Sequence, residues 1–239
     1  MIRRPEIQKI VNGYDDLRIA VLGSHSALEI MDGAKDEGLD TIVFCQKGRE
    51  TPYQRFDRIA DEIKILKKFS EMSSTKNQKM LRDTNTIIVP HRSLTAYLGY
   101  NVIENSLKVP IFGNRALFQA EERNNKKNQY YLLKKARIKY PKIFKNPRDI
   151  NKPAIVKVQE KKRKLERAFF TVSSFSDYKK KSESKIKQGI ISKNDLKNAV
   201  IEQLAIGTYL NFNYFHTPIS KNVDFLGIER RLQTNIHDY

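Results

Sequence analysis

Short apolar segments alternate with amphipathic helical patterns through the first half of this 239-residue chain. The segments Arg18–Leu22, Thr41–Cys45 and Thr86–Val89 are almost wholly apolar, and Gly23 and Pro90 end the first and the third. Apolar runs of this length that stop at turn residues are typical of buried strands. Because helical patterns separate the strands, the sequence predicts a parallel sheet with helices on both of its faces.

The second half has a different pattern, in which predicted strands follow one another with few helices between them. This pattern is typical of an α+β module with mostly antiparallel strands. We therefore expect an α/β domain over residues 1–122 and a second, α+β domain over residues 123–239. Along this half the sequence predicts helices at Gln119–Lys139 and Phe175–Gln188, and strands at Pro153–Val158, Arg167–Val172, Val200–Ile206, Tyr209–Phe215 and Asn222–Gly227.

Positive charge is concentrated in one segment of the chain. There are 45 Lys and Arg against 27 Asp and Glu, a net charge of +18, and residues 123–167 hold 17 of the basic and 3 of the acidic side chains. One interpretation is a positive field that attracts phosphate groups. The other interpretation is a solvated face of a chain that is rich in lysine throughout. The sequence favours neither interpretation over the other.

Composition and missing motifs exclude several classes of protein. With 39% hydrophobic and 30% charged residues, the chain is too apolar for a disordered protein and too charged for a membrane protein. Cys45 is its one cysteine, which excludes an intrachain disulfide and a Cys-x-x-Cys zinc site. The sequence contains no G-x-G-x-x-G, Walker A or G-x-S-x-G motif, and its four histidines lack the spacing of zinc ligands. Since it has no apolar run of bilayer length and no signal peptide, we expect a cytoplasmic protein without a membrane partner.

Polar and cationic side chains follow the ends of four predicted strands. His25 lies in the turn after the first strand, Arg49 follows the second, Ser93 follows the third, and Arg115 follows a short predicted strand at 110–112. The carboxyl ends of parallel strands meet at one edge of the sheet, where open α/β sheets bind ligands. Arginines and helix N-termini at this edge suit a phosphate group, although a serine there is also a common helix cap. The sequence thus predicts a cleft for a phosphorylated metabolite.

Charged residues inside apolar strands are further candidates for a binding site. Lys157 interrupts the predicted strand Pro153–Val158, and Glu202 interrupts Val200–Ile206. A charged side chain in such a strand is costly unless it reaches solvent or a charged partner. Lys157 is therefore either a phosphate-binding residue or a residue that extends to solvent from an edge strand. Arg231, after the last predicted strand, has the same two interpretations.

Taken in order, the short motifs of this chain resemble those of one enzyme family. They are GSHS, KGR, VPH-x-S, FGNR, IVK, IE-x-x-x-x-G and FLGIERR, and together they extend over nearly the whole chain. Their order is similar to that of the formate-dependent 5-formaminoimidazole-4-carboxamide ribonucleotide synthetases of archaeal purine biosynthesis, members of the ATP-grasp superfamily. Enzymes of this family use ATP and formate to formylate aminoimidazole carboxamide ribonucleotide on the way to IMP, with formyl phosphate as the proposed intermediate.

The resemblance implies a fold, a set of ligands and roles for the matched residues. Residues 1–122 would form a Rossmann-like pre-ATP domain, and residues 123–239 an incomplete ATP-grasp domain. The ligands would be ATP, Mg²⁺, formate and the ribonucleotide, and we expect a homo-oligomer. The metal ligands of the family lie in a part that would follow Tyr239, so no metal ligand is expected within this chain. We expect Lys157 and Arg231 to be catalytic, His25, Ser93, Arg49 and Arg115 to contact the ribonucleotide, and Lys134, Lys157, Glu202, Gln203, Leu204 and Gln233 to contact ATP.

Several residues depart from the family pattern. Residues 159–167 contain no glycine where the family has a glycine-rich loop over the phosphates, and glycines let backbone N–H groups approach phosphate closely. Tyr131 and Gln233 stand where a lysine and a glutamate are expected, and Arg92 replaces a glycine. These departures favour a divergent paralogue. They also support a second hypothesis, a nucleotide-binding regulatory protein without catalysis.

Length and charge lead to two further expectations. The family continues well past Tyr239, so we expect a C-terminally truncated chain that is inactive alone. The basic segment 123–167 supports a third hypothesis, a nucleic-acid-binding protein whose affinity would fall steeply with salt. No RNA- or DNA-binding motif accompanies the segment, and nucleic acid is therefore not the expected partner.

Overall fold

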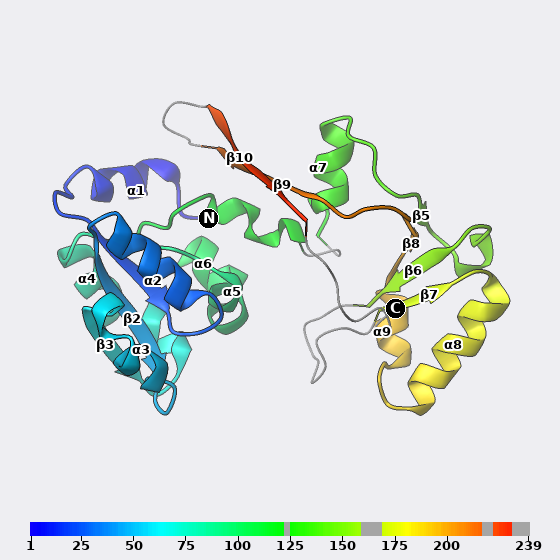
Figure 1. Ribbon diagram of the computed structural model, residues 1–239, viewed down its shortest axis with the longest axis horizontal. Coiled ribbons are helices and arrows are strands. Elements are labelled where there is room, and N and C mark those ends of the chain that lie inside the picture. The colour runs from blue at the N-terminus through cyan, green and yellow to red at the C-terminus, as the bar shows by residue number, and fades with distance from the viewer. Residues whose placement is uncertain (122–124, 159–168, 217–221, 231–239) are drawn as a thin grey trace. The chain divides into compact units, whose positions relative to one another are not determined.

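The computed structural model describes residues 1–121, 125–158, 169–216 and 222–230. The chain divides into two compact units, Met1–Gln119 and Ala120–Tyr239 (Figure 1). The first contains a parallel sheet and the second an antiparallel one, so the chain has a mixed α/β fold. Across the described residues, no helix combines the length and the apolar character that a membrane span needs.

Four parallel strands form the sheet of the first unit, in the order β3-β2-β1-β4. Ala20 in the middle of β1 pairs with Ile42 on one side and with Ile88 on the other. The three strands expected from the apolar runs are confirmed, whereas the segment 110–112 makes only an isolated bridge, from Ile111 to Ile88. The strands are β1 (Arg18–Leu22), β2 (Asp40–Gln46), β3 (Glu62–Leu66) and β4 (Thr86–Ile88).

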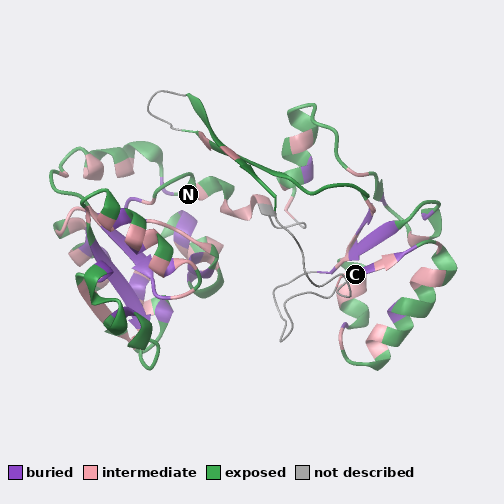
Figure 2. Ribbon diagram, in the orientation of Figure 1, coloured by how far each residue is buried: buried purple, intermediate pink, exposed green. Residues whose placement is uncertain are grey.

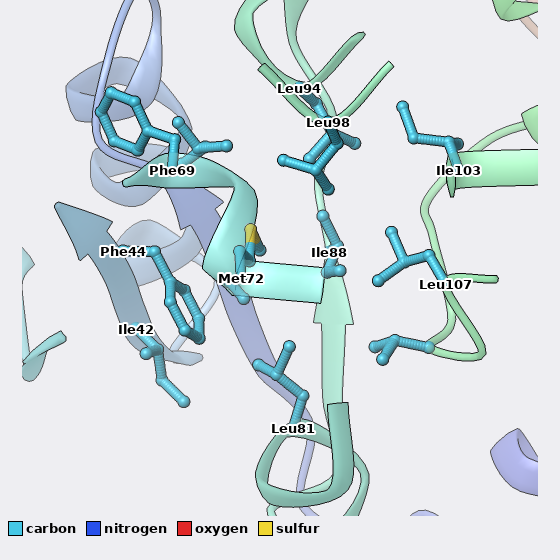
Figure 3. Packing of buried hydrophobic residues seen from close by; sticks show 13 residues of the cluster. Ile42, Phe44, Phe69, Met72, Leu81, Ile88, Leu94, Leu98, Ile103 and Leu107 are labelled. Atoms are coloured by element: carbon cyan, nitrogen blue, oxygen red, sulfur yellow. The ribbon is translucent and has the colours of Figure 1, made fainter. Parts of the chain in front are cut away.

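Helices cover both faces of this sheet, as the alternation in the sequence predicts. The helices up to residue 121 are α1 (Arg4–Val11), α2 (Ala27–Asp36), α3 (Thr51–Arg55), α4 (Thr75–Asp83), α5 (Arg92–Leu98) and α6 (Tyr100–Asn105), with the 3₁₀ turns η1 (Asp57–Ile59), η2 (Phe69–Ser73) and η3 (Arg115–Glu121); α1 has no buried residue. Successive strand residues point to opposite faces. Leu22 and Phe44 therefore pack against residues of η2, α4, α5 and α6 (Figure 3), while Val21 and Cys45 pack against α2. The sheet between them is the most buried part of the unit (Figure 2).

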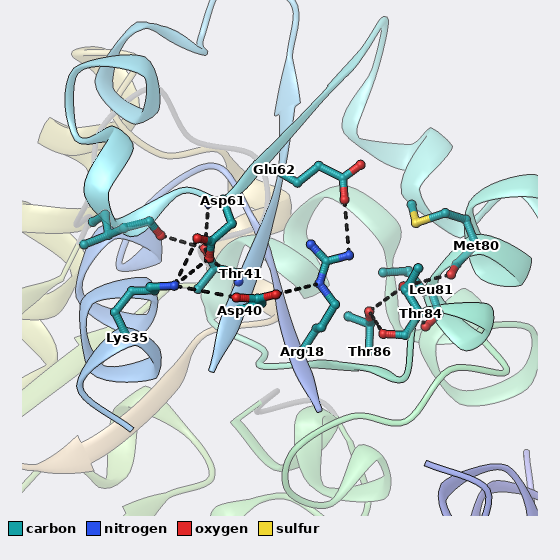
Figure 4. Close-up of polar contacts among 11 residues, drawn as sticks. Arg18, Lys35, Asp40, Thr41, Asp61, Glu62, Met80, Leu81, Thr84 and Thr86 are labelled. Atoms are coloured by element: carbon teal, nitrogen blue, oxygen red, sulfur yellow. Dashed lines mark hydrogen bonds and ion pairs between the residues drawn. The ribbon is translucent and has the colours of Figure 1, made fainter. Parts of the chain in front are cut away.

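Polar contacts close the edge of the sheet at which the strands begin (Figure 4). The Asp61 carboxylate accepts hydrogen bonds from Thr41 N at 2.8 Å and from the Lys35 ammonium at 3.0 Å. The Arg18 guanidinium lies 3.3 Å from a Glu62 oxygen on the neighbouring part of this edge. Burial raises the pKa of Asp61, but the hydrogen bonds from Lys35 and Thr41 outweigh burial, so this pKa lies below its usual value.

Replacing Asp61 by asparagine is expected to lower the free energy of unfolding by about 1–2 kcal/mol near neutral pH, because a hydrogen-bonded charge is lost. A carboxyl whose pKa is lowered by folding stabilises the protein above its unfolded pKa of about 3.9 and loses this contribution as the pH falls through the folded value. The difference from wild type should therefore shrink below about pH 4. Urea unfolding on both sides of this pH measures it. Asp83→Asn, which removes an exposed partner of Lys79, is the control and should cost less than about 0.5 kcal/mol; an equal loss in both variants would contradict the prediction.

The antiparallel sheet of the second unit has the strand order β5-β8-β6-β7. Ile155 in β6 lies opposite Thr171 in β7 and opposite Glu202 in β8. Val156 points to the other face, where it packs in a cluster with residues of α8 such as Tyr178. The elements are α7 (Gln129–Lys135), β5 (Ile143–Phe144), η4 (Pro147–Asp149), β6 (Ala154–Lys157), β7 (Phe170–Val172), α8 (Phe175–Lys187), α9 (Lys193–Lys197) and β8 (Val200–Gln203), followed by β9 (Asn211–His216) and β10 (Val223–Glu229), which pair as a separate antiparallel ribbon.

Several elements of this unit are shorter than the sequence predicts, among them the helix α7 and the strand β8. The helix expected over Gln119–Lys139 is confined to α7, because the Asn128 side chain accepts a hydrogen bond from Tyr131 N and caps the helix start. Arg137, with φ of 57°, follows its end in the left-handed region. Strand β8 also ends earlier than the expected segment Val200–Ile206.

Candidate functional site

The turn after β1 is fixed against the core by Gly23. Its N–H donates to Phe44 O at 2.8 Å, which joins the turn to β2. A Cβ atom at this position would lie 2.9 Å from Cys45 Sγ, 3.0 Å from the Tyr53 ring and 3.2 Å from Phe44 O. The position therefore requires glycine. Burial also raises the pKa of the Cys45 thiol to about 12, so this cysteine is a packing residue without thiolate reactivity.

His25 occupies an unusual backbone position in this turn. Its φ is 49°, in the left-handed region that disfavours side chains, and its Nδ1 lies 2.6 Å from Ser26 Oγ. Its ring stacks on that of His91, with 5.9 Å between the ring centroids and an interplanar angle of 17°. Backbone strain of this kind is concentrated at binding sites. Since β1 and β4 are neighbours in the sheet, two imidazoles meet at its carboxyl edge.

His91 connects this turn to the start of α5. Its Nε2 lies 2.8 Å from Leu22 O, and its Nδ1 lies 3.2 Å from Ser93 N. Because the carbonyl only accepts and the amide only donates, both hydrogen bonds form when Nε2 carries the proton and the ring is neutral. Burial lowers the pKa of His91, and nearby His25 acts in the same direction. The neutral ring is therefore the favoured state.

Three predicted ribonucleotide contacts lie in α5 or in turns that contact it. His25 and Ser93 are linked through the imidazole just described, and Ser93 is buried in the first turn of α5. Arg49 lies in the turn after β2, and its Nη1 donates to Tyr97 Oη of α5 at 3.0 Å. Its guanidinium also lies 5.6 Å from the centre of the Phe69 ring. Side chains from three strand ends are thus tied to α5.

Arg115, the fourth predicted ribonucleotide contact, has a different environment. Its Nη1 donates to Ile103 O and Leu107 O, both at 2.8 Å, and its Nη2 donates to Val109 O at 2.9 Å. Three backbone carbonyls therefore hold the guanidinium and tie together the chain after α6. These bonds give Arg115 a structural role that the sequence motif did not indicate.

His91 is the residue to which sequence reasoning assigned no role, although it lies within the VPH-x-S motif. The available signal was its place between the strand-ending Pro90 and a predicted helix, which is the position of an N-cap. Its contact with Leu22 O could not be predicted, since it depends on β1 and β4 being neighbours.

In the second unit, Lys157 and Glu202 form an ion pair between β6 and β8. Glu202 lies opposite Ile155, so Lys157 is its diagonal neighbour on the same face of the sheet. The Glu202 side chain is 8% exposed, and its second oxygen accepts a hydrogen bond from Tyr130 Oη at 2.5 Å. This buried carboxylate thus has both a cation and a hydroxyl donor, as a buried charge requires. The Lys157 side chain is 21% exposed, so solvent reaches part of it although its ammonium is paired with Glu202.

Backbone hydrogen bonds hold the segment that follows Glu202. Gln203 N donates to Lys142 O and Leu204 N donates to Pro153 O, both at 2.8 Å. Two chain segments from different parts of the unit therefore fix the predicted ATP contacts Gln203 and Leu204, which come directly after the ion pair.

The remaining predicted ATP-site residues fall into two groups. Lys134 is exposed in the last turn of α7, the helix that also carries Tyr130. Arg231, Gln233 and the glycine-free segment 159–167 lie outside the described residues. Within the described ranges, no three His, Cys, Asp or Glu side chains are grouped so that they could hold a metal ion.

Solved structures with a similar fold are ATP-grasp enzymes. The IMP biosynthesis protein PurP from Thermococcus kodakaraensis aligns with a TM-score of 0.61 and 23% identity over 92% of this chain and 61% of that chain. The biotin carboxylase domain of the Hydrogenobacter thermophilus 2-oxoglutarate carboxylase, solved with MgADP and bicarbonate, aligns with a TM-score of 0.60 and 12% identity over 88% of this chain and 49% of that chain. At these identities the likeness defines the fold class, which is that of ATP-grasp enzymes.

Sequence comparison defines the family. Residues 19–144 match a family model described as "Protein of unknown function (DUF1246)", and residues 177–239 match one described as "Domain of unknown function (DUF1297)". A curated relative from Methanopyrus kandleri, a 5-formaminoimidazole-4-carboxamide-1-(beta)-D-ribofuranosyl 5'-monophosphate synthetase, is 42% identical over 238 residues, 99% of this chain. The chain belongs to the DUF1246 family, and its resemblance to these synthetases is confirmed. It spans 65% of the length of that relative.

Proposed function

We propose that this chain carries the nucleotide-binding parts of a ligase that uses ATP and formate to formylate aminoimidazole carboxamide ribonucleotide. The observation that carries the proposal is the Lys157–Glu202 pair, which holds a partly exposed lysine at the end of β6 in a fold shared with ATP-grasp enzymes. The names of the curated relatives, which are synthetases of 5-formaminoimidazole-4-carboxamide ribonucleotide, support the reaction. The MgADP of the biotin carboxylase supports ATP and Mg²⁺ as ligands.

The proposed reaction has two steps. A formate oxygen attacks the γ-phosphorus of ATP, which gives formyl phosphate and ADP. The amine of the ribonucleotide then attacks the formyl carbon, phosphate leaves, and the nitrogen loses a proton. The first step needs cations around the spreading negative charge, for which we propose Lys157 and Arg231, while bound Mg²⁺ supplies further positive charge. The proposed ATP contacts are Lys134, Lys157, Glu202, Gln203, Leu204 and Gln233.

The proposed ribonucleotide site is the carboxyl edge of the parallel sheet. His25 and Ser93 would contact the ribonucleotide there, and Arg49 would attract its phosphate. Arg115 would contribute through the segment that its three carbonyl contacts hold. On this proposal residues 1–122 are a Rossmann-like pre-ATP domain and residues 123–239 belong to an ATP-grasp domain of a cytoplasmic homo-oligomer.

Calorimetric titration of the chain with ATP plus Mg²⁺ and, separately, with aminoimidazole carboxamide ribonucleotide tests the proposal. We expect saturable binding of both nucleotides, and loss of the ATP signal in Lys157→Ala. Mass spectrometry of the ribonucleotide after incubation with ATP, formate and Mg²⁺ reports formylation. A wild-type chain that binds neither nucleotide would overturn the proposal.

A second candidate is a nucleotide-binding regulatory protein without catalysis. It is favoured by the absence of glycine from residues 159–167 and by Tyr131, which is exposed on α7 where the family pattern has a lysine. Binding of both nucleotides without formylation by the full-length protein would favour this candidate, and turnover would reject it.

A further inference from the structure

We propose that His91 is a positioning residue, which in its neutral, Nε2-protonated form sets the two side chains, His25 and Ser93, that contact the ribonucleotide. This inference rests on the proposed function, because it concerns the same ribonucleotide site. His91 itself is not among the residues proposed to touch the substrate.

A single imidazole makes three contacts with the elements that form this site. Its Nε2–H donates to Leu22 O, the last residue of β1, at 2.8 Å. Its Nδ1 accepts from Ser93 N at 3.2 Å, and its ring stacks on His25 at 5.9 Å. Removal of the ring therefore disconnects the turn after β1 from the start of α5.

The His25 backbone needs such support. A left-handed φ is unfavourable for a residue with a side chain, and the conformation persists only where its surroundings fix it. Among the described residues, the His25 side chain makes two contacts, the bond to Ser26 Oγ and the stacking on His91. Only the second of these joins His25 to a different strand of the sheet.

The charge state of the His91 imidazole determines whether its hydrogen bonds to Leu22 O and Ser93 N can both form. A proton on Nδ1 would meet the Ser93 N–H, so the cap of α5 would be lost. Burial favours the neutral ring, and nearby His25 acts in the same direction, whereas the Leu22 carbonyl and the Glu29 carboxylate favour the charged ring. His25 and Glu29 are the titratable groups that act on His91. Affinity for the ribonucleotide should therefore hold at neutral pH and fall as the pH is lowered below the ordinary histidine pKa of about 6.5.

Two substitutions separate the two hydrogen bonds. Asparagine at position 91 keeps an acceptor in the Nδ1 position and is a preferred N-cap, but it does not reach Leu22 O. Glutamine keeps a donor that extends toward Leu22 O, but it is a poor cap. If His91 were only the cap of α5, His91→Asn would behave as wild type. If it positions His25 and Ser93, His91→Asn should keep the thermal stability and lose affinity.

The test is calorimetric titration of wild type, His91→Asn and His91→Gln with aminoimidazole carboxamide ribonucleotide across the pH range of histidine titration. We expect His91→Asn to melt close to wild type, to bind the ribonucleotide about tenfold more weakly, the effect of losing one hydrogen bond, and to lose the pH dependence. His91→Gln should weaken binding and also lower stability. Wild-type affinity in a folded His91→Asn variant would overturn the inference.

Nitrogen NMR of the imidazoles without ligand keeps this test separate from that of the proposed function. We expect wild-type His91 to show the Nε2-protonated tautomer, and the His25 backbone shifts to change in His91→Asn. A chain with these signals that binds no ribonucleotide would contradict the proposed function alone. The inference itself would be overturned if wild-type His91 carried its proton on Nδ1, or if the backbone chemical shifts of His25 were the same in His91→Asn as in wild type.

Discussion

Replacing Lys157 by methionine is expected to lower the affinity for ATP by about 10- to 100-fold, the range for the loss of a charge-assisted hydrogen bond. Methionine keeps most of the apolar stem, so the change removes mainly the ammonium. The same substitution leaves the Glu202 carboxylate, 8% exposed, without its cation. Loss of one partner of a buried pair costs about 3–5 kcal/mol, and the remaining Tyr130 bond favours the low end of this range. Titration with ATP plus Mg²⁺ and urea unfolding measure the two effects.

A double variant separates binding from stability. In Lys157→Met/Glu202→Gln the uncompensated charge is removed, and the glutamine carbonyl can still accept from Tyr130 Oη. We expect this variant to regain most of the lost stability and to remain weak in ATP binding. Tyr130→Phe is the matched control, since it should cost about 1–2 kcal/mol of stability through the lost hydroxyl bond while it leaves the ammonium in place. ATP binding at wild-type strength in the double variant would contradict the role of Lys157.

Periodicity in the sequence predicted well those strands whose side chains are buried on both faces of the sheet. Strands β1, β2 and β4 are apolar along nearly their whole length, so periodicity and the turn residues after them were sufficient. Strand β3 was missed because Glu62 and Lys64 interrupt it at the edge of the sheet, where one side is open to solvent. The helix after Gln119 was overextended because a cap at Asn128 and a left-handed Arg137 override a favourable composition.

Pairing between candidate residues could not be predicted from sequence. Lys157 and Glu202 were recognised as charges in apolar strands, but the ion pair depends on the register of β6 against β8. The His25–His91 contact likewise depends on a strand order in which β4 lies beside β1, whereas alternation of strands and helices fixes only that the strands are parallel. Arg115 was predicted to contact a ligand because it lies in a motif. In the structure two of its nitrogens instead donate to backbone carbonyls of its own unit.

Replacing Gly23 by alanine is expected to lower the free energy of unfolding of the first unit by about 1–3 kcal/mol, the usual cost of overpacking. The added methyl would lie 2.9 Å from Cys45 Sγ and 3.2 Å from the Phe44 carbonyl, and both residues are fully buried in the sheet. Because the carbonyl also accepts the hydrogen bond of Gly23 N, the turn cannot yield without losing that bond. Affinity for the ribonucleotide should fall as well, since His25 lies in the same turn.

Two further variants show whether the loss comes from this contact. Cys45→Ala removes the nearest atom, so in a double-mutant cycle Gly23→Ala should cost less in the Cys45→Ala background than in wild type. Gly33→Ala is the matched glycine control: nothing lies within 4 Å of a Cβ at this position in α2, and helix propensity predicts a gain of about 0.5–1 kcal/mol. Urea unfolding measures the stability of the wild type and of all four variants. If Gly23→Ala matched Gly33→Ala in stability, or if its cost were the same in both backgrounds, the close packing of the turn against β2 would not be what requires a glycine there.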